Sequence, residues 1–110
     1  MPLAERERFP ERPDGRDISF HFESLDFAAV ERKLNGYYAE FQPLLPGTAR
    51  MYHHAGVEFL SVLRGKLEMH IGTEDYVLDS GDSIYFDSGV SHSYRRAGQK
   101  PCSAIVVTAA

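Results

Sequence analysis

The sequence lacks a long apolar run, a second cysteine and a concentrated basic segment. No stretch approaches the roughly 18 apolar residues that a membrane-spanning helix needs, and the N-terminus is charged where a signal peptide would be apolar. Cys102 has no partner for a disulfide within the chain and lies in an apolar run, so we expect a buried thiol, with a reactive thiol as the alternative. These absences predict a cytoplasmic protein with no membrane partner.

The charge balance is acidic, with 16 Asp and Glu against 12 Lys and Arg and a formal net charge of −4. Binding to nucleic acid requires a concentrated basic face, and the pair Arg95 and Arg96 is too small a cluster to provide one. We therefore expect no direct nucleic acid contact from this chain. The expected partners are a small molecule, a metal ion or another protein chain.

The 110 residues are enough for one domain with a single core. Residues 1–16 alternate acidic and basic side chains, carry three prolines and contain almost nothing to bury. This composition is typical of a linker. We predict a charged arm over residues 1–16 and a folded domain over residues 17–110.

Glycines recur every seven to eleven residues from Gly36 to Gly98, and the intervals between them have the alternation and length of strands. Ile18, Phe20 and Phe22 alternate with polar residues in the same way, whereas Ser24 to Gly36 is expected to be a short helix or a loop. Short strands at this spacing predict an all-β sandwich or barrel. The expected strands are Tyr37–Gln42, Thr48–His54, Val57–Leu63, Lys66–Ile71, Asp75–Leu78, Ser83–Phe86, His92–Arg96 and Ser103–Thr108.

Residues 52–65 hold the side chains that could carry chemistry. On a strand, Tyr52 and His54 point to one side and His53 to the other. The turn at residues 55–56 then lets Glu58 come alongside His54, and His92 follows another glycine turn downstream. Two imidazoles and a carboxylate form the ligand set of a facial triad, which leaves open positions on a divalent metal such as Zn, Fe, Mn, Ni or Cu.

Two longer segments strengthen this hypothesis. The first runs from Gly47 through His53, His54 and Glu58 to Gly65, and it resembles the first motif of the cupin superfamily. The second, residues 81–92, reads Gly-Asp-Ser-Ile-Tyr-Phe-Asp-Ser-Gly-Val-Ser-His and resembles the second cupin motif. The resemblance implies a single cupin domain, a jelly-roll barrel also called a double-stranded β-helix, with His54, Glu58 and His92 as the metal ligands.

The sequence departs from the cupin pattern at the first histidine, where Tyr52 stands if His54 is the second. Tyr52 is therefore an alternative fourth ligand, although a neutral phenol binds metals poorly. Asp87 and Arg96 replace the residues that are usual at those positions of the second motif.

Readings without metal are also open at this stage. His54 and His92 could serve as hydrogen-bonding groups of a ligand pocket. Glu58 could form an ion pair with Arg50 or Arg64.

Within the superfamily, the chain most resembles the cupin sensor domain that follows a helix-turn-helix in XRE-family transcriptional regulators. The phrases that carry this resemblance are Glu58-Phe59 through Val62-Leu63-Arg64-Gly65, residues 81–86 and Ala104-Ile105-Val106-Val107-Thr108. Residues 1–16 are similar to the linker of such proteins. The resemblance implies a homodimeric, ligand-sensing domain without its DNA-binding head.

The alternatives are a small metal-dependent enzyme, such as a dioxygenase or isomerase, and a stand-alone metabolite-binding cupin. We expect a binding role more than a catalytic one, because the first histidine is missing. The ligand-binding residues expected in either case are Tyr52, His54, Glu58, Tyr85, His92 and Tyr94.

Overall fold

Strands account for most of the chain that the computed structural model describes, which comprises residues 8–10, 20–25, 34–43 and 51–109. Their bounds follow the alternation of apolar and polar residues between the glycine turns. The strands are β1 Arg8–Pro10, β2 Phe20–Ser24, β3 Leu34–Phe41, β4 Val57–Arg64, β5 Lys66–Ile71, β6 Glu74–Asp79, β7 Ser83–Asp87, β8 His92–Ala97 and β9 Cys102–Ala109.

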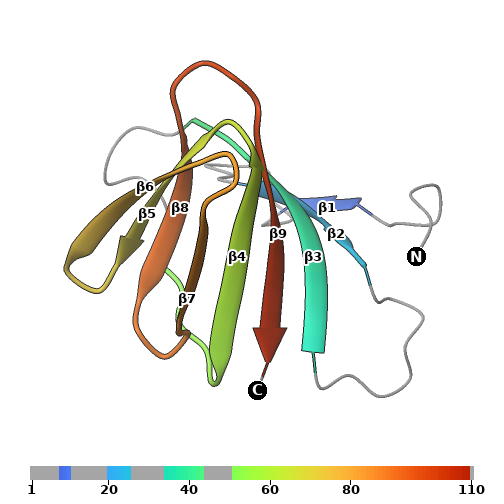
Figure 1. Cartoon of the computed structure of the whole chain (residues 1–110). Helices are drawn as coiled ribbons and strands as arrows, with labels where there is room; N and C mark the ends of the chain where they lie inside the picture. The colour runs from blue at the N-terminus through green and yellow to red at the C-terminus, as the bar shows by residue number, and fades with distance from the viewer. Residues whose placement is uncertain (1–7, 11–19, 26–33, 44–50, 110) are drawn as a thin grey trace.

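The strands form two antiparallel sheets, one of six strands in the order β1-β2-β3-β9-β4-β7 and one of three in the order β6-β5-β8. Figure 1 shows β4, β9 and β3 side by side, with β5, β6 and β8 in a second layer. Most neighbouring strands in the large sheet are distant in sequence. This is the arrangement of a jelly roll, so the predicted fold class is confirmed.

The core lies between the two sheets, and β4 and β5 contribute alternate side chains to it. Leu60 and Val62 of β4 are at most 1% exposed, and Leu67 and Met69 of β5 are fully buried. Cys102 is also buried, and desolvation raises the pKa of its thiol to about 11. The expectation of a buried thiol is therefore confirmed.

Two of the expected strands differ from the structure. The strand expected over Thr48–His54 is absent from residues 51–54, where Tyr52 forms only an isolated bridge to His92. Residues 44–50 lie outside the described part of the chain. The strand that we expected to begin at Tyr37 begins at Leu34 instead.

The short helix or loop expected from Ser24 to Gly36 is wrong at both ends, because Ser24 ends β2 and Gly36 lies within β3. The middle of that segment, residues 26–33, lies outside the described residues.

The segment expected to be an arm includes β1, which pairs with β2. Residues flanking β1 are not described, so the division into arm and domain stays a prediction. No described helix is long and apolar enough to cross a membrane.

Gly65 connects β4 to β5 at a point where the chain has no room for a side chain. Its φ is +77°, and a Cβ atom would lie 2.3 Å from the carbonyl oxygen of Pro101. Gly81 also has a positive φ, +92°, but no atom lies within 4 Å of its Cβ position. Alanine at position 81 would therefore carry only the cost of a left-handed backbone conformation. Alanine at position 65 would carry that cost and a steric clash as well.

We expect Gly81→Ala to lower the free energy of unfolding by about 1 to 2 kcal/mol, the usual cost of a left-handed non-glycine residue. Gly65→Ala should cost about 3 kcal/mol or more, because backbone must also move. Urea unfolding of both variants and the wild type measures the difference. If both substitutions lowered the free energy of unfolding equally, the close approach of Gly65 to the carbonyl oxygen of Pro101 would be contradicted.

Candidate functional site

The segment before β4 is held against β8 by backbone hydrogen bonds. The Tyr52 amide donates to the His92 carbonyl at 2.6 Å, and the His92 amide donates to the Tyr52 carbonyl at 2.8 Å. The His54 amide donates to the carbonyl of Ser88 in the turn between β7 and β8, at 2.9 Å. This pairing brings His54 beside His92, although 38 positions separate them in the sequence.

Strand parity directs the other two side chains to the same place. Glu58, the second residue of β4, points inward with Leu60, and His92, the first residue of β8, points inward with Tyr94. Glu58 is 2% exposed and His92 is 1% exposed. The site therefore lies inside the barrel, at the end where β4 and β8 begin.

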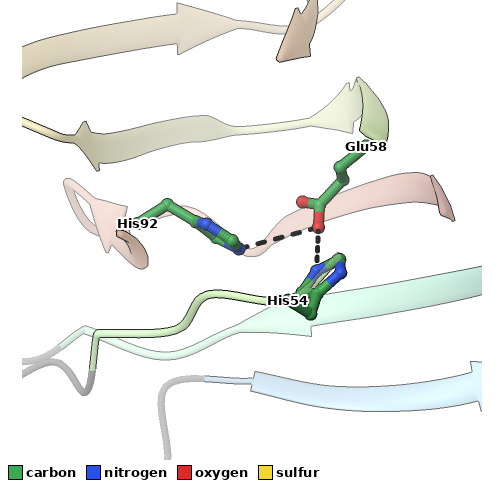
Figure 2. Close-up of side chains that lie close together, drawn as sticks. All are labelled: His54, Glu58 and His92. Carbon is green, nitrogen blue, oxygen red and sulfur yellow. Dashed lines mark ion pairs between the residues drawn. The ribbon is translucent and has the colours of Figure 1, made fainter. Parts of the chain in front are cut away.

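Figure 2 shows the three side chains converging on one carboxylate oxygen. Glu58 Oε1 lies 3.4 Å from His54 Nε2 and 3.7 Å from His92 Nε2, and one ligating atom from each residue lies within 4.8 Å of the others. Donor atoms around an ion at about 2.0–2.2 Å are about 3 to 3.5 Å apart. Small side-chain adjustments would bring these atoms to that spacing, and the His54 side chain, 41% exposed, has room to make them.

Hydrogen bonds at the far side of each ring determine which imidazole nitrogen carries a proton. His92 Nδ1 lies 2.8 Å from the Val90 carbonyl oxygen, and His54 Nδ1 lies 3.3 Å from that of Ala55. A carbonyl only accepts, so Nδ1 donates in both rings, and in the neutral imidazole Nε2 carries the lone pair. Both lone pairs are thus directed toward Glu58, as in the outer-shell arrangement of metal-binding histidines.

Tyr94 fixes the orientation of the carboxylate. Its hydroxyl donates a short hydrogen bond to Glu58 Oε2, while Oε1 faces the imidazoles. Burial raises the pKa of the Tyr94 phenol well above its ordinary value, and the negative charge of Glu58 raises it further. Tyr94 therefore stays protonated and acts as a donor.

The donor set fits a divalent transition metal. Two neutral nitrogens and one carboxylate oxygen are the ligands of a facial triad, which zinc, iron, manganese, nickel and copper accept. In the neutral rings the three lone pairs also face one another, an arrangement that a proton or a metal ion between them would stabilise. Within the described residues, the ion-pair partners of Glu58 are His54 and His92. The alternative that Glu58 pairs with Arg64 is therefore wrong, and Arg50 lies outside the described part.

A cavity of about 240 Å³ opens beside the triad. Its wall is mostly aromatic and apolar, and no lysine or arginine contributes to it within the described ranges. The lining residues are Phe20, Phe22, Tyr37, Ala39, Phe41, Tyr52, His54, Glu58, His92, Tyr94, Val106 and Thr108.

Five of the six residues expected to bind a ligand line this cavity, namely Tyr52, His54, Glu58, His92 and Tyr94. Whether they bind one stays a prediction.

Tyr85 does not line the cavity, so its expected place in the wall is wrong. Its neighbour Phe86 points inward and packs on His92 at a centroid distance of 4.9 Å, which leaves Tyr85 on the outer face, 68% exposed. His53 is exposed and does not line the cavity, whereas His54 does.

Sequence reasoning did not assign the wall contributed by β2, β3 and β9. Phe20, Phe22 and Phe41 were recognised only as strand residues, and Thr108 is brought beside Glu58 by the register of β9 on β4. The alternation in β2 shows which side chains share a face. It does not show that β2 pairs with β3 at the edge of the site.

The family comparison agrees with this geometry. Residues 38–108 match the family model described as the cupin domain. The chain belongs to the cupin family.

Solved structures with the same fold include an enzyme and a regulator. Hydroxypropylphosphonic acid epoxidase from S. wedmorenis superposes with a TM-score of 0.80 at 23% identity, over 98% of this cupin and 57% of that chain. The iron(II) form of HppE has a TM-score of 0.80 at 24% identity, over 98% of this cupin and 58% of that chain. This cupin thus spans a little more than half of those proteins.

The cupin domain of an XRE-family transcriptional regulator from Enterobacter cloacae has a TM-score of 0.70 at 18% identity. The match covers 84% of this cupin and 97% of that chain. At these identities the likeness shows the fold. A search of curated proteins found no match.

Replacing Tyr94 tests its control of the carboxylate. Tyr94→Phe removes the donor to Glu58 Oε2, so we expect the affinity for Co(II) to fall about 10-fold, as is usual when an outer-shell partner is lost. Tyr85→Phe, on the outer face, is the matched control and should leave the affinity unchanged. Titration followed by the visible Co(II) spectrum measures both, and equal affinities for Tyr94→Phe and wild type would contradict the positioning role.

Proposed function

We propose that this cupin is a small metalloenzyme that holds one divalent metal ion between His54, Glu58 and His92 and acts on a small organic substrate in the adjoining cavity. The observation that carries the proposal is the convergence of His54 Nε2, His92 Nε2 and Glu58 Oε1 on one point. A three-ligand set is the pattern of catalytic metal sites, whereas structural sites are usually closed by a fourth protein ligand.

The residues of the site would have different roles. His54, Glu58 and His92 would hold the ion, and Tyr94 would keep Glu58 Oε1 directed at it. An ion bound in this way supplies Lewis acidity or, as iron(II), a centre for dioxygen chemistry. The aromatic wall would bind the substrate and exclude water from the site.

The fold neighbours support a metal-dependent role. Structures of HppE with iron(II) and with cobalt(II) and substrate are among them. Because this cupin spans little more than half of that protein's length and the identity is low, neither its substrate nor its reaction is carried over.

The second candidate is the ligand-sensing domain of a transcriptional regulator. Two observations favour it. The match to the cupin domain from Enterobacter cloacae covers 97% of that chain, and residues 1–16 have the charged composition of a linker. In this role the same cavity would bind a signal molecule. The expected homodimer would then require a contact surface. Phe59 of β4 and Tyr85 of β7 lie opposite each other on the outer face, are exposed, and would provide an apolar one.

Elemental analysis of protein purified without chelator tests the metal site. We expect at least about 0.5 ion per chain, and a thermal midpoint that falls by several degrees in EDTA, because an ion bound only to the folded state stabilises it.

The metal content should also decrease when the pH is lowered below about 6, since an imidazole must be neutral to ligate. His92→Ala should lose the ion and His53→Ala should keep it, whereas less than about 0.1 ion per chain, with the midpoint unchanged in EDTA, would rule out a metal site.

Azide binding distinguishes an open site from one closed by Tyr52. A three-ligand site has free positions, so azide should change the visible spectrum of the Co(II) protein, and Tyr52→Phe should respond in the same way. Ligation by Tyr52 would instead give the Fe(III) protein a visible charge-transfer band that Tyr52→Phe removes. That band, together with no response to azide, would exclude the enzyme proposal and leave the sensor.

A further inference from the structure

We propose that Thr108 positions the ligand of this site. Its hydroxyl hydrogen-bonds the second oxygen of a carboxylate whose first oxygen is bound to the metal ion, while the apolar remainder of the ligand packs on the cavity wall. The inference rests on the metal site of the proposed function and adds to it a residue and a ligand class. Thr108 is not among the ligands of the ion, so one experiment distinguishes the failure of this proposal from the failure of the other.

Thr108 lies next to the triad because of the register of the large sheet. It is the β9 residue directly opposite Glu58 of β4, and in an antiparallel pair two such side chains stand on the same face with Cβ atoms about 4.5–5.5 Å apart. Both side chains line the cavity. Glu58 is buried, whereas Thr108 is partly exposed. Thr108 therefore presents accessible surface to the cavity beside the carboxylate that would hold the ion.

The cavity extends from Glu58 toward β9 and not toward β7. Phe86, the β7 partner of Glu58, is buried, packs on the ring of His92 and does not line the cavity. On the other side, the wall continues from Thr108 to Val106 of the same strand and to aromatic residues of β2 and β3. A molecule that fills the cavity and contacts the ion therefore lies beside Thr108.

The tyrosine hydroxyls of the described wall are not available at this position. The Tyr94 hydroxyl is bonded to Glu58, and the Tyr52 hydroxyl is buried beneath the surface of the cavity. Tyr37 lies two positions further along the sheet than Glu58. Among the described lining residues, Thr108 is therefore the one that bears a hydroxyl level with the carboxylate of the triad.

The charge of the metal-loaded site favours an anionic group. A divalent ion beside Glu58 and two neutral imidazoles leaves one positive charge, and a buried site is more stable when that charge is balanced. A carboxylate supplies one negative charge and two oxygens, one for the ion and one for Thr108. A hydrogen bond to an ionised acceptor is also stronger than one between neutral groups. The ligand class is therefore a monocarboxylate with an apolar body, which matches the mostly aromatic wall.

Optical titration of the Co(II) protein with two carboxylates tests the ligand class. Acetate and benzoate should both change the visible Co(II) spectrum. Benzoate should bind at least about 5-fold more tightly, because its ring is removed from water by the apolar wall. Equal affinities for the two, or no spectral change with either, would overturn the ligand class.

The variant Thr108→Val isolates the hydroxyl. Valine keeps the β-branched shape, so both carboxylates should bind about 10-fold more weakly while the affinity for Co(II) stays unchanged. Thr108→Ser keeps the hydroxyl and should bind both within about 2-fold of the wild type. Thr73→Val, in the exposed turn between β5 and β6, is the matched control and should change neither affinity.

Two results would overturn the role of Thr108. One is the same carboxylate affinity in Thr108→Val and the wild type, and the other is a loss in Thr108→Ser as large as that in Thr108→Val. Either result would leave the metal site of the proposed function intact, because Co(II) binding is measured in the same titration. A protein that gives no Co(II) spectrum would instead overturn the metal site and this inference together.

Discussion

The buried carboxylate of Glu58 is the constraint on which the rest of the site depends. A charged group at 2% exposure loses its hydration, and the cost is several kcal/mol unless partners replace the water. Tyr94 satisfies one oxygen with a hydrogen bond, and the other oxygen faces only imidazole nitrogens that carry lone pairs. The site is therefore electrostatically incomplete without a proton or a metal ion. A carboxylate held in this way is poorly suited to being a purely structural element of the core.

The fold places these groups by nonlocal pairing. Glu58 lies on β4, between β7 and β9, whereas His92 lies on β8 in the other sheet. The two backbone hydrogen bonds between Tyr52 and His92 connect the segment that bears His54 to the small sheet. The triad thus spans both layers of the barrel, and its geometry depends on their packing. These hydrogen bonds hold the backbone of His54 at the end of the barrel even though the residue lies outside a strand.

Sequence patterns predicted what depends on local alternation and spacing. The strands from Val57 onward match their expected bounds closely, and the choice of His54 over His53 follows from parity, as does the inward position of Glu58. The same reasoning failed for Tyr85, because adjacent residues of a strand cannot both face the cavity and Phe86 takes the inner side.

The short helix or loop expected from Ser24 to Gly36 was wrong at both ends. Ser24 pairs with Tyr37 of β3, pairing with β9 extends β3 back to Leu34, and tertiary pairing outweighs a weak local preference. Tyr52 and Tyr94 were expected in the pocket wall, but the part of the wall formed by Phe20, Phe22 and Phe41 could not be predicted. It depends on which strands become neighbours, and that information lies in the whole sheet and not in any one segment.

Tyr52 shows how one departure from a motif changes the chemistry that a site can support. Its backbone keeps the bridge to His92, so the fold does not require a histidine at this position. With a fourth imidazole, the ion would be more fully enclosed by protein. With a neutral phenol, which binds metals poorly, the ligand set would keep an open side, while the Tyr52 ring forms part of the cavity wall. The residue that weakens the match to the metal motif is therefore compatible with the fold, and it leaves two imidazoles and one carboxylate as the candidate ligands.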